Sequence, residues 1–312
     1  MTIKLQDRNP EYWEKLFQMT ANVVKQMSDE FERGVKWEYS VPLIDFKRET
    51  SGINRSPFIT RQGKGCILCM PVGFLKWMDD FVIDMQEYLG SNNGFCVNNG
   101  KNDISLWILQ NWISWITQHE LGHLFNGHYV GDTREWDDWN KFEHFDTLNN
   151  DDRLSFEYDA DMYAANSFFS GLAYAINIDN RLKNWGEKYF NDLGFIFFVL
   201  FTIMEERDPN PLLHLAAYDR LMIFLLRGFK IFETTNNTKP VKEFKAFQLG
   251  MARSVMAIGD QGKNLLDKVK NFNHDKITQS IKVLVENKYH IRRLYQMKSD
   301  WLRDTNALFY KN

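Results

Sequence analysis

The chain has 312 residues, of which 44% are hydrophobic and 15% aromatic, so it can bury a sizeable core in one or two domains. Its net charge of −3 gives no overall attraction to nucleic acid or to an anionic membrane, and we expect neither as a partner. The three cysteines, Cys66, Cys69 and Cys96, are too few for a disulfide framework, and a zinc knuckle would need a second pair. We expect all three to be reduced thiols.

The first predicted elements are a helix and a group of short strands. Residues 10–33 place apolar side chains on one rough helical face. Residues 35–70 contain short β-like runs punctuated by glycines, and Gln62-Gly-Lys-Gly predicts a hairpin between the last two runs. We therefore expect a small antiparallel sheet, whose edge could hold an extended peptide. Residues 73–89 return to a helical pattern, and the start of the chain has no apolar run typical of a secretory signal.

A histidine motif follows a long apolar run. Residues 119–123 read His-Glu-Leu-Gly-His, and the apolar spacing over residues 104–116 is typical of a buried helix. On a helix, His119 and His123 project from one face, where their nitrogens can bind one Zn²⁺. Glu120 can act as the general base on an attacking water. The motif indicates a zinc metallopeptidase, and the alternative is a core helix with two ordinary histidines.

A catalytic zinc usually takes three protein ligands, so a third ligand is expected downstream. The candidates are His128, His144, Asp146, Glu157 and Asp161. The metzincin pattern would need a glycine and a histidine where this chain has Asn126 and Tyr129, and His128 misses that register by one residue. The metzincin arrangement is therefore not expected.

The segment from residue 156 to residue 166 contains the favoured third ligand. Glu157 and Asp161 lie four residues apart on a predicted helix with several alanines, which allow close packing against the histidine helix. Glu157 would bind the metal, while Asp161 would accept a hydrogen bond from the non-ligating nitrogen of His119. Gly122 lacks a side chain where a second helix or a substrate strand could approach closely. Without the histidines, a solvated helix face would be an equal alternative for two acids at this spacing.

A third segment begins after two prolines that mark a turn. The helix predicted there carries His214, Tyr218 and Arg220. His214 or Tyr218 could donate a hydrogen bond to the oxyanion that forms in acyl transfer. Arg220 could instead hold Glu157 or Asp161 through a charged pair. The alternative is a helix start with an ordinary histidine and a surface arginine.

These three segments together resemble the Lit-type phage-exclusion peptidases. The resemblance is carried by residues 113–123, 157–161 and 214–220, and residues 65–71 and 74–81 look like the strand and helix that precede the motif in that family. It covers roughly residues 60 to 226. More distantly, the order is similar to the HExxH, ExxxD, HP and R motifs of membrane peptidases of the CAAX-prenyl-protease type.

The resemblance implies a gluzincin in which His119, His123 and Glu157 bind zinc and Glu120 is the base. It also implies a bacterial cytoplasmic protease used in defence against phage, with translation elongation factor Tu as its best-known target and with a trigger that activates it. The chain departs from both groups at Leu215, where they carry proline after the histidine. This departure leaves the substrate open.

Three further stretches complete the prediction. Residues 132–153 contain eight acidic and three basic residues, a balance of −5, and could form either a lid or a solvated loop. Residues 193–204 are too few to span a bilayer, which needs about twenty residues, and predict a buried helix. Residues 239–312 contain fifteen basic and seven acidic residues, a balance of +8, with helical patterns at 277–285 and 292–308.

Together, these patterns predict a predominantly helical α+β protein with a zincin-like HExxH helix, a small antiparallel sheet and a helical C-terminal part. We expect residues 1–235 to form the metallopeptidase domain and residues 236–312 a basic helical region, as a separate module or as part of the same domain. The expected function is zinc-dependent cleavage of an intracellular protein or peptide in the cytoplasm. The alternative is a sensor or binding module on a peptidase scaffold, with a structural metal.

Overall fold

The computed structural model describes residues 10–34, 44–49, 56–62, 65–85, 95–96, 104–125, 150–207, 215–236, 239–259 and 262. By residue contacts, the chain forms two compact units, residues 1–120 and 121–312, and the boundary between them falls inside one continuous helix. Among the described helices, none is long and apolar enough to cross a membrane. The fold is mostly helical, with one small sheet.

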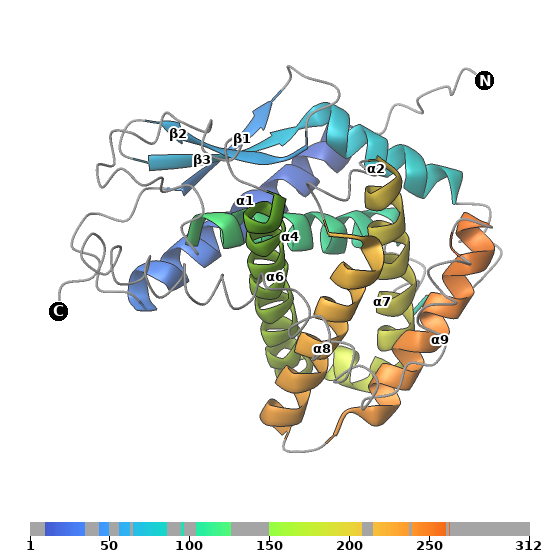
Figure 1. Cartoon of the computed structure of the whole chain (residues 1–312). Helices are drawn as coiled ribbons and strands as arrows, with labels where there is room; N and C mark the ends of the chain where they lie inside the picture. Colours follow the sequence, from blue (N-terminus) through green and yellow to red (C-terminus); the bar gives the residue numbers. More distant parts are fainter. Residues whose placement is uncertain are drawn as a thin grey trace. The chain divides into compact units, whose positions relative to one another are not determined.

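The sheet of the first unit has three strands in the order β1-β3-β2 (Figure 1). Its strands are β1 (Ile44–Glu49), β2 (Phe58–Gln62) and β3 (Gly65–Pro71). Strands β2 and β3 are antiparallel and pair Gln62 with Gly65, which confirms the predicted hairpin. The predicted small antiparallel sheet is thus present in β2 and β3, but strand β1 runs parallel to β3, so the sheet as a whole is mixed. In β1, apolar and polar residues alternate only over residues 44–47, so the sequence pattern that predicts this strand is weak.

Two helices flank this sheet. Helix α1 (Pro10–Gly34) contacts β1 and buries Leu16 and Phe17, and it confirms the helix predicted for residues 10–33. Helix α2 (Val72–Asp84) follows β3 directly. It confirms the helix predicted for residues 73–89 as far as Asp84, where Met85 ends it, and the residues after Met85 lie outside the described ones. Residues 67–70 of β3 are all buried, as expected for a central strand covered on both faces.

Helix α4 (Ile104–Phe125) carries the histidine motif. Trp112, Trp115 and Ile108 are almost fully buried, and so is Leu121 beyond the first histidine. A helix that is apolar around most of its circumference must lie inside the protein. The predicted buried helix is therefore confirmed, and the histidine motif is part of it.

The second unit consists of long helices that lie side by side (Figure 1). They are α6 (Asn150–Ile178), α7 (Asn180–Arg207), α8 (Ala217–Asn236) and α9 (Val241–Ile258). Helix α6 packs on α8, and α7 packs on α9. Phenylalanine rings fill the space between them; the ring of Phe224, for example, lies 4.3 Å from that of Phe197 and 4.5 Å from that of Phe169, measured between centroids. The apolar stretch 193–204 lies within α7 and is buried almost throughout, as predicted.

Helices α7 and α9 approach each other closely enough for their backbones to meet. A methyl group added at Gly194 would lie 2.0 Å from the carbonyl oxygen of Phe247, so only glycine fits there. Beside this contact, Arg253 on α9 bonds to the fully buried Asp192 on α7, at 2.8 Å between Nη2 and Oδ1. Residues 241–258 therefore belong to the same compact unit as α6, α7 and α8. The predicted helices at 277–285 and 292–308 lie outside the described residues.

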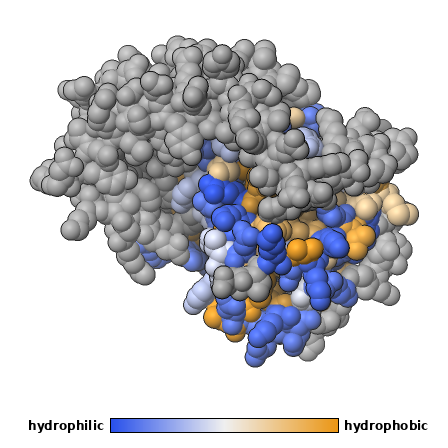
Figure 2. Space-filling model, turned by 60° about the horizontal axis from the view of Figure 1, so that its bottom comes forward, coloured by the Kyte–Doolittle hydropathy of each residue, from blue (hydrophilic) through white to orange (hydrophobic). Residues whose placement is uncertain are grey.

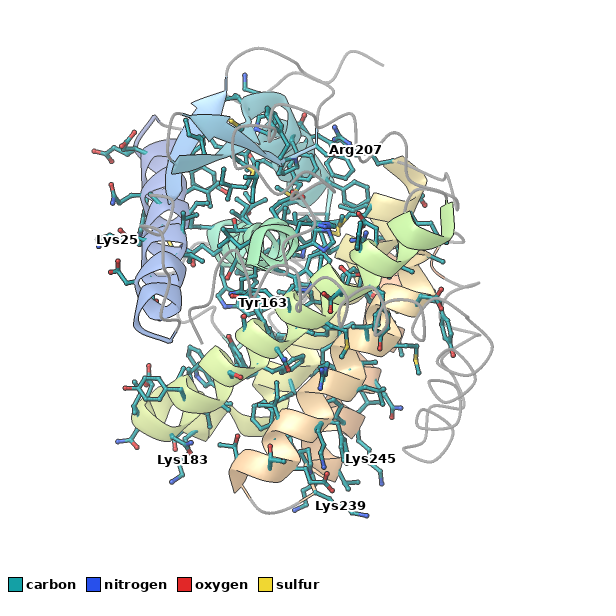
Figure 3. The ribbon with its side chains drawn as sticks, turned by 60° about the vertical axis from the view of Figure 1, so that its left-hand side comes forward. Lys25, Tyr163, Lys183, Arg207, Lys239 and Lys245 are labelled. Atoms are coloured by element: carbon teal, nitrogen blue, oxygen red, sulfur yellow. The ribbon has the colours of Figure 1, made fainter. Side chains whose placement is uncertain are left out.

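The described surface of the helical unit is mainly polar. Its exposed large apolar side chains are Tyr174, Ile178, Val241, Leu249 and Met256. Figure 2 shows separate hydrophobic areas between hydrophilic ones on the face that it presents. Figure 3 places Lys183, Lys239 and Lys245 toward one end of this unit, where α7 and α9 begin. Scattered apolar groups among charged ones are ordinary for a protein surface.

Candidate metal centre

The two histidines of α4 lie on one face of the helix, one turn apart. His119 is 6% exposed and His123 is 4% exposed, while Glu120 between them is only half-buried. Buried imidazoles and a partly accessible carboxylate suit different tasks. The histidines can hold a cation away from bulk water, and the carboxylate can reach a molecule that enters from outside.

Helix α6 brings Glu157 to these histidines. The Glu157 side chain is buried, and its Oε1 lies 3.4 Å from Nε2 of His123. One potential ligand atom from each of His119, His123 and Glu157 can be chosen so that all three lie within 4.8 Å of one another. Among the described residues, this is the group of side chains that could hold a metal ion. The favoured third ligand is thus brought together with the two histidines.

The donor set fits zinc in type and in spacing. Two imidazole nitrogens and one carboxylate oxygen are a common ligand set of a catalytic Zn²⁺, which keeps a fourth position open. Zinc–ligand bonds of about 2.0–2.2 Å in a tetrahedral arrangement place neighbouring donor atoms about 3.4 Å apart. The separation between His123 Nε2 and Glu157 Oε1 has this value.

Arg220 on α8 contacts both acids of α6. Its Nη2 lies 2.7 Å from Glu157 Oε2, and its Nη1 lies 3.5 Å from Asp161 Oδ1. The sequence left open whether Arg220 holds Glu157 or Asp161, and the structure has it contacting both. Because Arg220 occupies Oε2, Oε1 is the oxygen that faces His123. A divalent cation beside these two buried carboxylates would add to the positive charge that Arg220 supplies.

The start of α8 is fixed by a contact from α7. The carboxylate of Glu205 accepts a hydrogen bond from the backbone N–H of Ala217, at 3.3 Å, in the first turn of the helix that carries Arg220. A negative charge is favourable at this end of a helix. Burial, together with the charge of Glu205, raises the pKa of the neighbouring Glu206 and favours its neutral form. Glu205 was not predicted, because a contact between two helices leaves no mark in local sequence.

Gly122 is the point where α4 and α6 meet. A methyl group added there would lie 3.0 Å from Cβ of Tyr163 and 3.1 Å from both Cα and the carbonyl oxygen of Ala160. Tyr163 is labelled on α6 in Figure 3. The sequence left open whether a second helix or a substrate strand approaches Gly122, and the structure brings a second helix. This close approach sets the distance between His123, the next residue on α4, and Glu157, one turn before Asp161 on α6.

The remaining predicted site residues are not all placed. His214, together with the earlier candidates His128, His144 and Asp146, lies outside the described residues. Tyr218 is half-buried on α8, and its hydrogen bond to the oxyanion stays a prediction. Asp161 contacts Arg220, and the hydrogen bond from His119 to Asp161 stays a prediction.

One contact of a candidate ligand was not predicted from the sequence. Trp115 lies one turn before His119, and the two rings stack. The spacing of four residues was the available signal.

Comparisons of the chain with protein families, with curated proteins and with solved structures found no match.

The close contact at Gly122 can be tested by adding one methyl group. We expect Gly122→Ala to displace α6 by a few tenths of an ångström and to weaken Zn²⁺ binding about tenfold. Alanine favours a helix over glycine by about 1 kcal/mol, so intrinsic propensity would act in the opposite direction. The control is Gly171→Ala on α6, where an added methyl group meets nothing within 4 Å. Equal zinc affinity in the two variants, measured by chelator competition, would refute the spacing argument.

The bridging role of Arg220 predicts a loss of stability. Arg220→Gln removes the charge that offsets two buried carboxylates, and we expect the free energy of unfolding to fall by about 3 kcal/mol. Arg220→Lys keeps the positive charge but loses the planar guanidinium that can donate to both acids at once. Its free energy of unfolding should lie between those of Arg220→Gln and the wild type. Urea unfolding measures both variants. Arg227→Gln, seven residues later on α8 and half-buried, is the control; a similar loss there would contradict the assignment.

Proposed function

We propose that this protein is a zinc-dependent endopeptidase of the gluzincin type. The observation that carries the proposal is the convergence of His119, His123 and Glu157, from two helices, with ligand atoms within 4.8 Å of one another. The half-buried Glu120 beside them supports a catalytic centre over a purely structural one. A closed structural zinc site usually has four protein ligands, commonly with cysteines among them.

In this proposal, each side chain has a separate task. A divalent cation held by the three ligands would polarise the scissile carbonyl and make a water more acidic. Glu120 takes a proton from the attacking water and delivers it to the leaving amine. Arg220 keeps the Glu157 carboxylate in one orientation, which matters because a ligand that rotates is ordered only at an entropic cost. His214 or Tyr218 is proposed to donate a hydrogen bond to the oxyanion.

The biological role is proposed from the sequence resemblance alone. The segments shared with Lit-type peptidases support a cytoplasmic protease that acts in defence against phage. They make elongation factor Tu the first protein substrate to test. A protease of this kind must be restrained in its own cell, so we propose that a phage-derived partner activates it. Substrate and trigger rest on the resemblance, whereas the metal centre rests on geometry.

The metal centre predicts the zinc content of purified protein. We expect about one zinc per chain in the wild type, a loss of zinc in His123→Ala and a reduced content in Glu157→Ala, because each variant removes a donor. Inductively coupled plasma mass spectrometry measures all three. Asp192→Asn, at a buried acid on α7 that also pairs with an arginine, controls for a general effect of losing a buried carboxylate. Absence of zinc from the wild type, even after supplementation, would contradict the proposal.

The assignment of Glu120 predicts a separation between binding and catalysis. We expect Glu120→Gln to keep its zinc and to lose cleavage by at least about a hundredfold, because the base is removed and the ligands are not. The assay incubates either protein with purified elongation factor Tu and with lysates of uninfected and phage-infected bacteria, and it maps new N-termini by mass spectrometry. Cleavage retained by the variant would refute the role of Glu120. Bound zinc without cleavage in any lysate would favour the sensor or binding module instead.

A further inference from the structure

The ring of Trp115 lies in an offset stack against the His119 imidazole. Their centroids are 5.5 Å apart and their planes differ by 24°, so the rings are stacked. Both belong to α4 and are separated by one helical turn. Trp115 is only 1% exposed, so its indole cannot swing into solvent, and His119 beneath it is 6% exposed. The stack is therefore a fixed part of the helix.

Such a stack restricts the χ2 torsion of histidine, which helical backbone geometry does not fix. The second χ angle of histidine is broad, whereas a ligand must present one nitrogen along one direction. An indole lying almost parallel to the imidazole allows it to slide but hinders its rotation. The electron-rich indole face also favours the positive charge that an imidazole acquires when it donates its lone pair to a cation. A buried indole further keeps water from that face of the ligand.

We propose that Trp115 is a positioning residue for His119, which sets the imidazole plane and strengthens cation binding. This inference rests on the proposed metal centre and adds to it a residue outside the HExxH motif. A tryptophan that only filled the core would affect stability, whereas Trp115 is also expected to affect the affinity for the cation. The helix offers a comparison in Trp112, which is equally buried on α4 but lies seven residues from His119.

The test compares full-length wild type with Trp115→Leu, Trp115→Phe and Trp112→Leu. Zn²⁺ affinity is measured by competition with a chromophoric chelator, and the visible spectrum of the Co²⁺-loaded protein reports the geometry of the ligands. We expect Trp115→Leu to weaken Zn²⁺ binding at least about tenfold and to alter the Co²⁺ spectrum, as loss of a supporting residue does in other metal sites. Trp115→Phe keeps a stacked ring and should stay within about threefold of wild type. Trp112→Leu should destabilise the fold without changing either readout.

The Co²⁺ titration also carries a readout that does not need the leucine variants to fold. Co²⁺ quenches nearby tryptophans, and the chain has 10 of them. Trp115→Phe should remove a larger part of the Co²⁺-dependent quenching than Trp112→Phe does. Equal effects of the two positions on affinity, spectrum and quenching would overturn the role of Trp115 while leaving the metal centre intact. Failure of the wild type to bind either metal would overturn both.

Discussion

Two carboxylates buried one turn apart on α6 are the constraint on which the helical unit depends. Each would cost several kcal/mol to bury without compensation. Arg220 contacts both Glu157 and Asp161, and it can do so only while α8 lies along α6. The charge compensation of the two acids therefore depends on the packing of α8 against α6. A change in the angle between α6 and α8 would separate the guanidinium from at least one acid.

The aromatic core supplies that fixed angle. Phe224 lies one turn after Arg220 on α8 and packs against Phe169 on α6 and Phe197 on α7. Aromatic rings bury large areas and have few rotamers, so a cluster of them resists sliding. The polar centre lies near one end of α6 and α8, and the ring cluster lies further along the same helices. The burial of these apolar rings thus offsets the cost of burying Arg220 together with Glu157 and Asp161.

Local sequence was enough to predict part of this arrangement. The shared face of His119 and His123 follows from helical geometry alone, and the choice of Glu157 follows from its place on a second helix. The predictions that failed or stayed open concern contacts between elements. Strand β1 is short and weakly patterned, and its parallel pairing with β3 depends on which edge of β3 is free. Whether Arg220 meets one acid or two depends on how α8 lies beside α6, which no periodicity encodes.

The histidine motif is usually written with two open positions, and in this protein neither is open. Leu121 is fully buried, so a polar residue there would lose its hydration. Gly122 faces the backbone of α6 at a distance that excludes a larger residue without movement. Packing therefore constrains both of these positions, in addition to the three that the proposed metal centre requires. A pattern search that accepts any residue at the two positions describes many sequences that this fold would reject, and the information in the motif is greater than its notation suggests.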